Sequence, residues 1–139
     1  TKIRIARLHS KIRNSRKHNI INIVNDIVKD NDIIVSENLN VKGMSKNHNL
    51  AKSIIDASFN MICNMLKWKT TIQGKYYYQV DTFYPSSKTC SRCGTKTDIT
   101  NNLSIRKWTC ENCGNENDRD INASINIMFE GLKLYYKTI

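Results

Sequence analysis

The sequence lacks any hydrophobic run near the roughly 20 residues that a membrane-spanning helix needs. Its first seven residues also lack the apolar core of a secretory signal peptide. We therefore expect a cytoplasmic protein that does not contact membranes. The chain begins with Thr1 rather than Met, so we expect it to be processed, trimmed or part of something longer.

Acidic residues are scarce, with 12 Asp and Glu against 22 Lys and Arg, which gives a formal net charge of +10. Seven cations precede the first acid, Asp26; they are Lys2, Arg4, Arg7, Lys11, Arg13, Arg16 and Lys17. Such an excess indicates a polyanionic partner, and a solvated helix face is the alternative. A membrane surface is less favoured, because no basic stretch is flanked by aromatic residues. The charge therefore favours nucleic acid.

Four of the five cysteines follow the spacing C-x2-C-x16-C-x2-C, at Cys90, Cys93, Cys110 and Cys113. Each C-x2-C pair can present two thiolates to one metal, and two pairs complete a tetrahedral zinc site. A glycine follows each pair and suits the turn there. Two disulfides fit poorly, since nothing indicates export. A closed four-thiolate shell leaves no open position, so we expect structural zinc. Cys63 lies in an apolar helical pattern and is expected in the core.

The hydrophobic periodicity predicts three helices and two strands. The first helix is residues 1–30, either unbroken or interrupted near 14–19. The second is residues 48–73, and the third begins at Asp118. The strands are residues 33–35 and 76–80, and residues 39–44 form a loop. The apolar faces should be Ile5, Leu8, Ile12, Ile20, Ile23 or Val24 and Ile27; Leu50, Ile54, Ala57 or Ser58, Met61, Met65, Trp68 and Ile72; and Ile121, Ile125, Met128 or Phe129, Leu132 and Tyr136. This order is α/β with a metal-bound insertion. Two strands are too few for a stable sheet under three helices, which again suggests a fragment.

Two places carry acids that could act in catalysis. Glu37 directly follows the apolar strand, where α/β folds place ligands, although an exposed strand end is the simpler reading. Asp118 and Asp120 begin the last helix, where acids commonly serve only as a cap and a dipole partner. Together these carboxylates could hold Mg²⁺ and act on a phosphodiester.

Four stretches, in this order, resemble the carboxyl-terminal half of the OrfB/TnpB-type nucleases of bacterial insertion sequences, which are related to the compact type V CRISPR effectors. They are IVSENLNVKGM (34–44), FYPSSKTCSRCG (83–94), WTCENCG (108–114) and DRDINASINI (118–127). The resemblance covers essentially the whole chain.

This resemblance implies a partial RuvC-like (RNase H-type) fold with a zinc ribbon inserted before its last helix. The RuvC-like part would be residues 1–84 and 118–139, and the ribbon 85–117. The family uses three acids to bind Mg²⁺ and cuts DNA under direction of a guide RNA. Glu37 matches its second acid and Asp120 its third.

The remaining site residues follow from the same resemblance. Asp118 would be a helix cap, while Arg119 and Asn122 would support the site or the scissile phosphate. The basic first helix, with Arg4, Arg7 and Lys11, would contact backbone phosphate.

One departure from the family is serious. Its first acid lies on an Asp-x-Gly strand, and no Asp-x-Gly occurs in this chain. Asp26, Asp32 and Asp56 lie in the wrong elements to replace it. The family activity is therefore not expected of these 139 residues alone. The alternatives are a truncated remnant that binds nucleic acid without cutting it, and a zinc-ribbon adaptor that binds protein.

Overall fold

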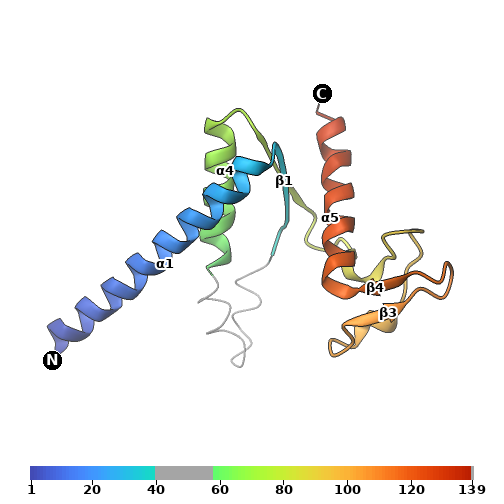
Figure 1. The fold of residues 1–139 in the computed structure, drawn as a ribbon, viewed down its shortest axis with the longest axis horizontal. Coiled ribbons are helices and arrows are strands. Elements are labelled where there is room, and N and C mark those ends of the chain that lie inside the picture. The colour runs from blue at the N-terminus through green and yellow to red at the C-terminus, as the bar shows by residue number, and fades with distance from the viewer. Residues whose placement is uncertain (40–57, 139) are drawn as a thin grey trace. The chain divides into compact units, whose positions relative to one another are not determined.

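The computed structural model describes residues 1–39 and 58–138 (Figure 1). The chain divides into two compact units. The helical unit comprises Thr1–Ile34 and Asn40–Tyr77, and the ribbon unit comprises Val35–Leu39 and Tyr78–Ile139. Within the described ranges, no helix combines the length and apolar character that crossing a membrane requires.

The helical unit is built on two helices, α1 (Lys2–Asp30) and α4 (Phe59–Ile72). The first helix is continuous, which decides between the two forms left open by its polar middle. Its last carbonyls need partners, and the Lys75 ammonium donates to the carbonyl oxygens of Val28 at 2.5 Å and Lys29 at 3.3 Å. A cation there also interacts favourably with the negative end of the helix dipole.

The core of this unit lies where α1 and α4 meet. Its buried members are Ile20, Val24, Val28, Ile34 and Leu66. The prediction for the first half of α1 is wrong, since Ile5, Leu8 and Ile12 are 50%, 54% and 55% exposed. The core residues that α1 contributes all lie from Ile20 onward. Within the described part of this unit, only the second half of α1 is therefore packed in the core.

The predicted apolar face of α4 is confirmed at Met65, which packs against this core, but not at the end of the helix. Trp68 and Ile72 are 64% and 63% exposed, whereas Leu66 and Thr70 are buried. The Thr70 hydroxyl donates to the Leu66 carbonyl oxygen at 2.9 Å, which satisfies a polar group in a buried position. The face of α4 that packs in this core thus includes Ile62, Met65 and Leu66, and of these three only Met65 belongs to the predicted stripe. Residues 48–57 of the expected helix lie outside the described residues, as does the loop beyond Leu39.

Strands β1 (Ile33–Glu37) and β2 (Tyr76–Val80) are hydrogen-bonded neighbours in a two-stranded sheet. Both were predicted, and β1 extends through Glu37 rather than ending at Val35. With the helices they make the described chain a mixed α/β structure, which confirms the fold class at that level.

In the ribbon unit, β3 (Lys107–Thr109) and β4 (Glu116–Asp118) form an antiparallel hairpin, and α5 (Arg119–Tyr136) follows at once. Two short 3₁₀ turns, Ser86–Lys88 and Ile99–Asn101, precede the hairpin.

The predicted cap of α5 is confirmed. The Asp118 carboxylate accepts hydrogen bonds from the backbone N–H groups of Asp120 at 3.0 Å and Ile121 at 3.2 Å. It therefore satisfies donors that the first turn leaves without helical partners.

The predicted apolar face of α5 is half-buried at Ile125 and Leu132 but wrong at its two ends. Ile121 and Tyr136 are 62% and 69% exposed, and the buried residues are Asn122, Asn126 and Gly131. At Gly131 a Cβ atom would lie 2.2 Å from Val35 Cγ2, so only glycine permits this approach of α5 to β1.

Candidate functional site

The two cysteine pairs form turns with the same hydrogen-bond pattern. The N–H of Gly94 donates to the Cys90 carbonyl at 2.8 Å, and that of Gly114 to the Cys110 carbonyl, also at 2.8 Å. Both glycines have positive φ, 76° and 67°, a conformation that other residues adopt at a cost. The expectation that glycine suits the turn after each pair is confirmed.

The four thiols converge on one point. All four Sγ atoms lie within 4.8 Å of one another, and Cys90–Cys113 and Cys93–Cys110 are 3.8 Å and 3.6 Å apart. A tetrahedron with Zn–S distances of about 2.3 Å has edges of about 3.8 Å. The donor set therefore fits a metal such as zinc. All five cysteines are free thiols, so the alternative of two disulfides is not realised.

Hydrogen bonds from the turns favour thiolate at two of these cysteines. The hydroxyl and backbone N–H of Thr95 lower the pKa of Cys93 to about 5. Burial raises the pKa of Cys90, but the backbone N–H groups of Cys93 and Arg92 outweigh it and the pKa is lowered. Thiolate is the form that binds metal, so the turns prepare the site for it.

The pKa of Cys113 moves in the opposite direction. The Asn115 N–H lowers it, but burial and the neighbouring sulfur atoms outweigh that effect and raise it to about 12. Four sulfurs this close cannot all ionise without a compensating cation, which is what a bound metal supplies.

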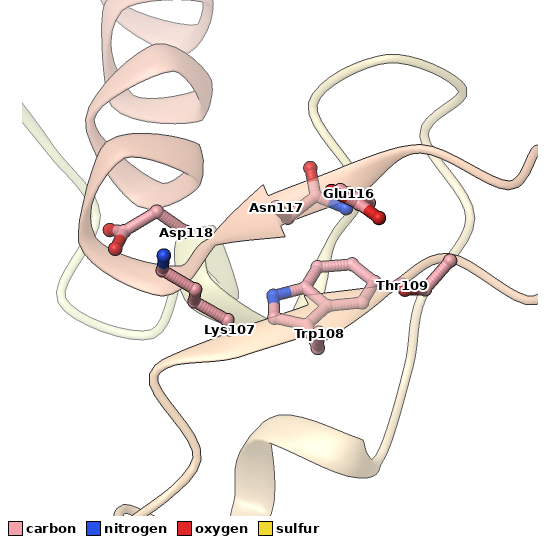
Figure 2. A pocket seen from close by; sticks show the side chains of 6 residues that line it. All are labelled: Lys107, Trp108, Thr109, Glu116, Asn117 and Asp118. Carbon is pink, nitrogen blue, oxygen red and sulfur yellow. The ribbon is translucent and has the colours of Figure 1, made fainter.

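A hollow of about 440 Å³ lies on the β3–β4 hairpin next to this cluster. Trp108 lies between the two strands, and Lys107 and Asp118 project at the end of the hairpin nearest α5 (Figure 2). The lining carries one cation and two carboxylates, from Lys107, Glu116 and Asp118. Its charge therefore selects no single class of ligand.

Two asparagines on α5 fasten the segment that leads into the first cysteine pair. Asn122 is 2% exposed; its Nδ2 donates to the Thr89 carbonyl and its Oδ1 accepts from the Ser91 N–H, both at 2.8 Å. Asn126 Nδ2 donates to the carbonyls of Ser86 at 2.8 Å and Thr89 at 2.7 Å. Both the oxygen and the nitrogen of the Asn122 amide are thus hydrogen-bonded within the protein.

Glu37 ends β1 and is half-buried. Its Oε1 accepts a hydrogen bond from the Ser86 hydroxyl at 3.0 Å. Because Ser86 is in turn bound by Asn126, hydrogen bonds connect Glu37 to the amino-terminal half of α5.

Asp120 lies in the first turn of that helix, in the same unit as Glu37. Its carboxylate is exposed and Oδ2 accepts from Arg106 at 3.3 Å. Arg119 beside it donates to the Leu103 carbonyl at 3.1 Å. Three or more acids, cysteines or histidines that lie close enough together could hold a metal. In the described part of the chain, the four cysteines form such a group. Neither Glu37 nor Asp120 belongs to such a group among the described residues.

The predicted phosphate-binding residues Arg4, Arg7 and Lys11 are exposed on the first turns of α1. They belong to the helical unit, while the two acids and the cysteines belong to the ribbon unit. Ser86 and Asn126 were not singled out from the sequence. The available signal was the pair of asparagines four residues apart, which places both on one face of α5.

Comparisons with known proteins agree with the sequence resemblance. Residues 59–127 match the family model of the Cas12f1-like, TNB domain. A protein of Streptomyces pristinaespiralis named "Putative RNA-guided DNA endonuclease" is 36% identical over 129 residues, which cover 93% of this chain and 32% of that protein. One of Escherichia coli K12, with the same name followed by InsQ, is 30% identical over 145 residues, covering 94% and 36%. The chain thus spans about a third of the length of these relatives.

A solved structure also matches, the "Cryo-EM structure of the Cas12f1-sgRNA-target DNA complex". The TM-score is 0.61 at 20% identity, over 91% of this chain and 36% of that one. At this identity the match concerns the fold alone.

Proposed function

We propose that this chain, a relative of the OrfB/TnpB-type and Cas12f1-like RNA-guided DNA endonucleases, is the carboxyl-terminal part of such an enzyme, encoded by a transposon. The reaction would be Mg²⁺-dependent hydrolysis of a DNA phosphodiester, directed by a guide RNA in the cytoplasm. The observation that carries the proposal is the position of Glu37: a carboxylate at the end of β1, hydrogen-bonded to the segment that α5 holds in place.

The fold assignment forms part of this proposal. Residues 1–84 and 118–139 would be a partial RuvC-like nuclease domain, and residues 85–117 its inserted zinc ribbon. The distances between the four thiols support zinc in that ribbon. With all four positions filled by sulfur, the metal would hold the ribbon together and take no part in hydrolysis.

Glu37 and Asp120 would hold Mg²⁺, which commonly binds through one or two carboxylates together with substrate phosphate and water. When bound, the cation activates water for attack and stabilises the charge that develops on the phosphate. Asp118 would remain a helix cap, and Arg119 would lie beside the phosphate. The family's first acid would have to come from an Asp-x-Gly strand outside this sequence, so cleavage requires more than these 139 residues.

Nucleic acid would contact the exposed cations of α1, including Arg4, Arg7 and Lys11. They are three of the seven cations that precede the first acid, and this excess of positive charge supports attraction to phosphate.

Carboxylate-to-amide substitutions test the acids. We expect Glu37→Gln and Asp120→Asn, each made in the protein as its gene encodes it, to abolish Mg²⁺-dependent DNA cleavage. Asp118→Asn is the matched control, because asparagine caps a helix about as well as aspartate and lies two residues from Asp120. The control should cleave normally. Cleavage that persists in either acid variant would refute the site.

A binding protein without nuclease activity is the second candidate, favoured by the net charge of +10. In that case the protein would bind DNA with an affinity that falls steeply with salt, and Mg²⁺ would produce no cleavage. A zinc-ribbon adaptor for another protein would show neither property.

A further inference from the structure

Ser86 is a buried serine whose hydroxyl faces Glu37. It is 6% exposed and lies 49 residues away along the chain, and its Oγ donates to Glu37 Oε1 at 3.0 Å. Such a bond to an ionised carboxylate is stronger than one between neutral groups.

The backbone of Ser86 is held independently of this hydroxyl. Its N–H donates to the Tyr84 carbonyl at 2.8 Å, and its carbonyl accepts from Asn126 Nδ2, also at 2.8 Å. Asn122 Nδ2 approaches the same carbonyl at 3.5 Å. Both backbone groups are thus satisfied by neighbours that a change of side chain leaves in place. The backbone of Ser86 is consequently held by Tyr84 and α5, independently of its contact with Glu37.

We propose that Ser86 is a positioning residue for Glu37: it holds one carboxylate oxygen, Oε1, so that the other is presented to a divalent cation. This inference rests on the proposed function, in which Glu37 is a metal ligand. A carboxylate at a strand end otherwise turns about two or three side-chain bonds, and ordering it at the moment of binding costs affinity. Partners of this kind typically contribute 10–100-fold to metal affinity or activity.

The same contacts link the two acids. Asn126 and Asn122 lie on the helix that carries Asp120, and both approach the Ser86 carbonyl. Through the hydroxyl of Ser86, Glu37 is therefore connected by hydrogen bonds to the helix that carries the other proposed ligand, Asp120. The neighbouring Ser87 has no described residue hydrogen-bonded to its hydroxyl, which makes it the matched control.

The test uses the protein as its gene encodes it, loaded with zinc. Mn²⁺ is the probe, and its binding is followed by the electron paramagnetic resonance of the free ion. Ser86→Ala should weaken Mn²⁺ binding about 10-fold or more. Ser87→Ala should leave it unchanged. In a Glu37→Gln background, Ser86→Ala should have no further effect, because a residue that acts through Glu37 has nothing left to position. Ser86→Thr, which keeps a hydroxyl, should bind nearly as tightly as the wild type.

Zinc content and the thermal unfolding midpoint are measured on the same samples. Because the backbone contacts of Ser86 remain, we expect Ser86→Ala to keep its zinc and unfold near the wild-type temperature. Suppose instead that Ser86→Ala loses zinc as well as Mn²⁺ affinity, and that Ser86→Thr binds Mn²⁺ as weakly as Ser86→Ala. Ser86 is then a structural residue and the inference is wrong.

The remaining outcomes separate this inference from the proposed function. If Glu37→Gln weakens Mn²⁺ binding and Ser86→Ala does not, the positioning role is refuted and the proposed site survives. If Glu37→Gln binds Mn²⁺ like the wild type, or if the wild-type protein as its gene encodes it shows no saturable binding, Glu37 is not a metal ligand and both proposals fall.

Discussion

Replacing Gly131 by alanine tests how closely α5 approaches β1, the strand that ends in Glu37. A Cβ atom at this position would lie 2.2 Å from Val35 Cγ2, 2.4 Å from Cγ1 and 2.8 Å from Cβ. Rotation of the valine side chain moves only the two methyl groups, so the contact with its Cβ would remain. The backbone of α5 or β1 must therefore shift.

Two effects of opposite sign determine the magnitude. Alanine is favoured over glycine within a helix by about 1 kcal/mol. Overpacking a well-filled position costs about 1–3 kcal/mol, and the three short distances place this site at the upper end. We therefore expect Gly131→Ala to lower the free energy of unfolding by about 2 kcal/mol.

Urea unfolding followed by tryptophan fluorescence measures this change. The chain has 2 tryptophans, so Trp68→Phe leaves Trp108 of the ribbon unit as the reporter. In a Val35→Ala background, which removes both short methyl contacts, Gly131→Ala should cost at least about 1 kcal/mol less. A Gly131→Ala protein as stable as the parent, or about 1 kcal/mol more stable, would show only helix propensity and refute this packing.

Three further changes test the ribbon and the basic helix. Cys110→Ser should release the metal and lower the unfolding temperature, because binding in a closed site is coupled to folding; one equivalent of zinc retained at full thermal stability would contradict the site. Asn122→Ala should cost about 1–3 kcal/mol in urea unfolding, since it leaves buried backbone groups without partners, and a change below about 0.5 kcal/mol would contradict the role of this side chain. Arg7→Ala should reduce the slope of log K for DNA against log salt by about 1, and an unchanged slope would remove Arg7 from the interface.

The sequence alone predicted the features that depend on residues close together in the chain. The spacing of the cysteines and the glycine after each pair were sufficient for the two turns, because each turn closes within five residues by its own backbone hydrogen bonds. The Asp118 cap and the bounds of β2 were likewise local, as was the helix up to Asp30, although the sequence left open whether that helix is continuous. The family resemblance came from motifs of this kind.

Only the tertiary structure decided which faces are buried. The apolar stripe predicted on α5 runs from Ile121 to Tyr136, but both of these residues are exposed and the helix buries Asn122 and Asn126 instead. The reason is that the carbonyls of Ser86 and Thr89 need donors, and asparagine supplies them where an aliphatic side chain would leave buried oxygen atoms unsatisfied.

The surroundings of Glu37 depended on tertiary structure in the same way. Its motif marked the residue, but Ser86 lies 49 positions away and reaches it only because α5 holds that serine by its backbone. The close approach of Gly131 to Val35 could not be predicted from the sequence either, because a glycine in a helix does not show which residue packs against it. The sequence thus determined which residues carry chemistry, and packing between distant segments decided what each of them contacts.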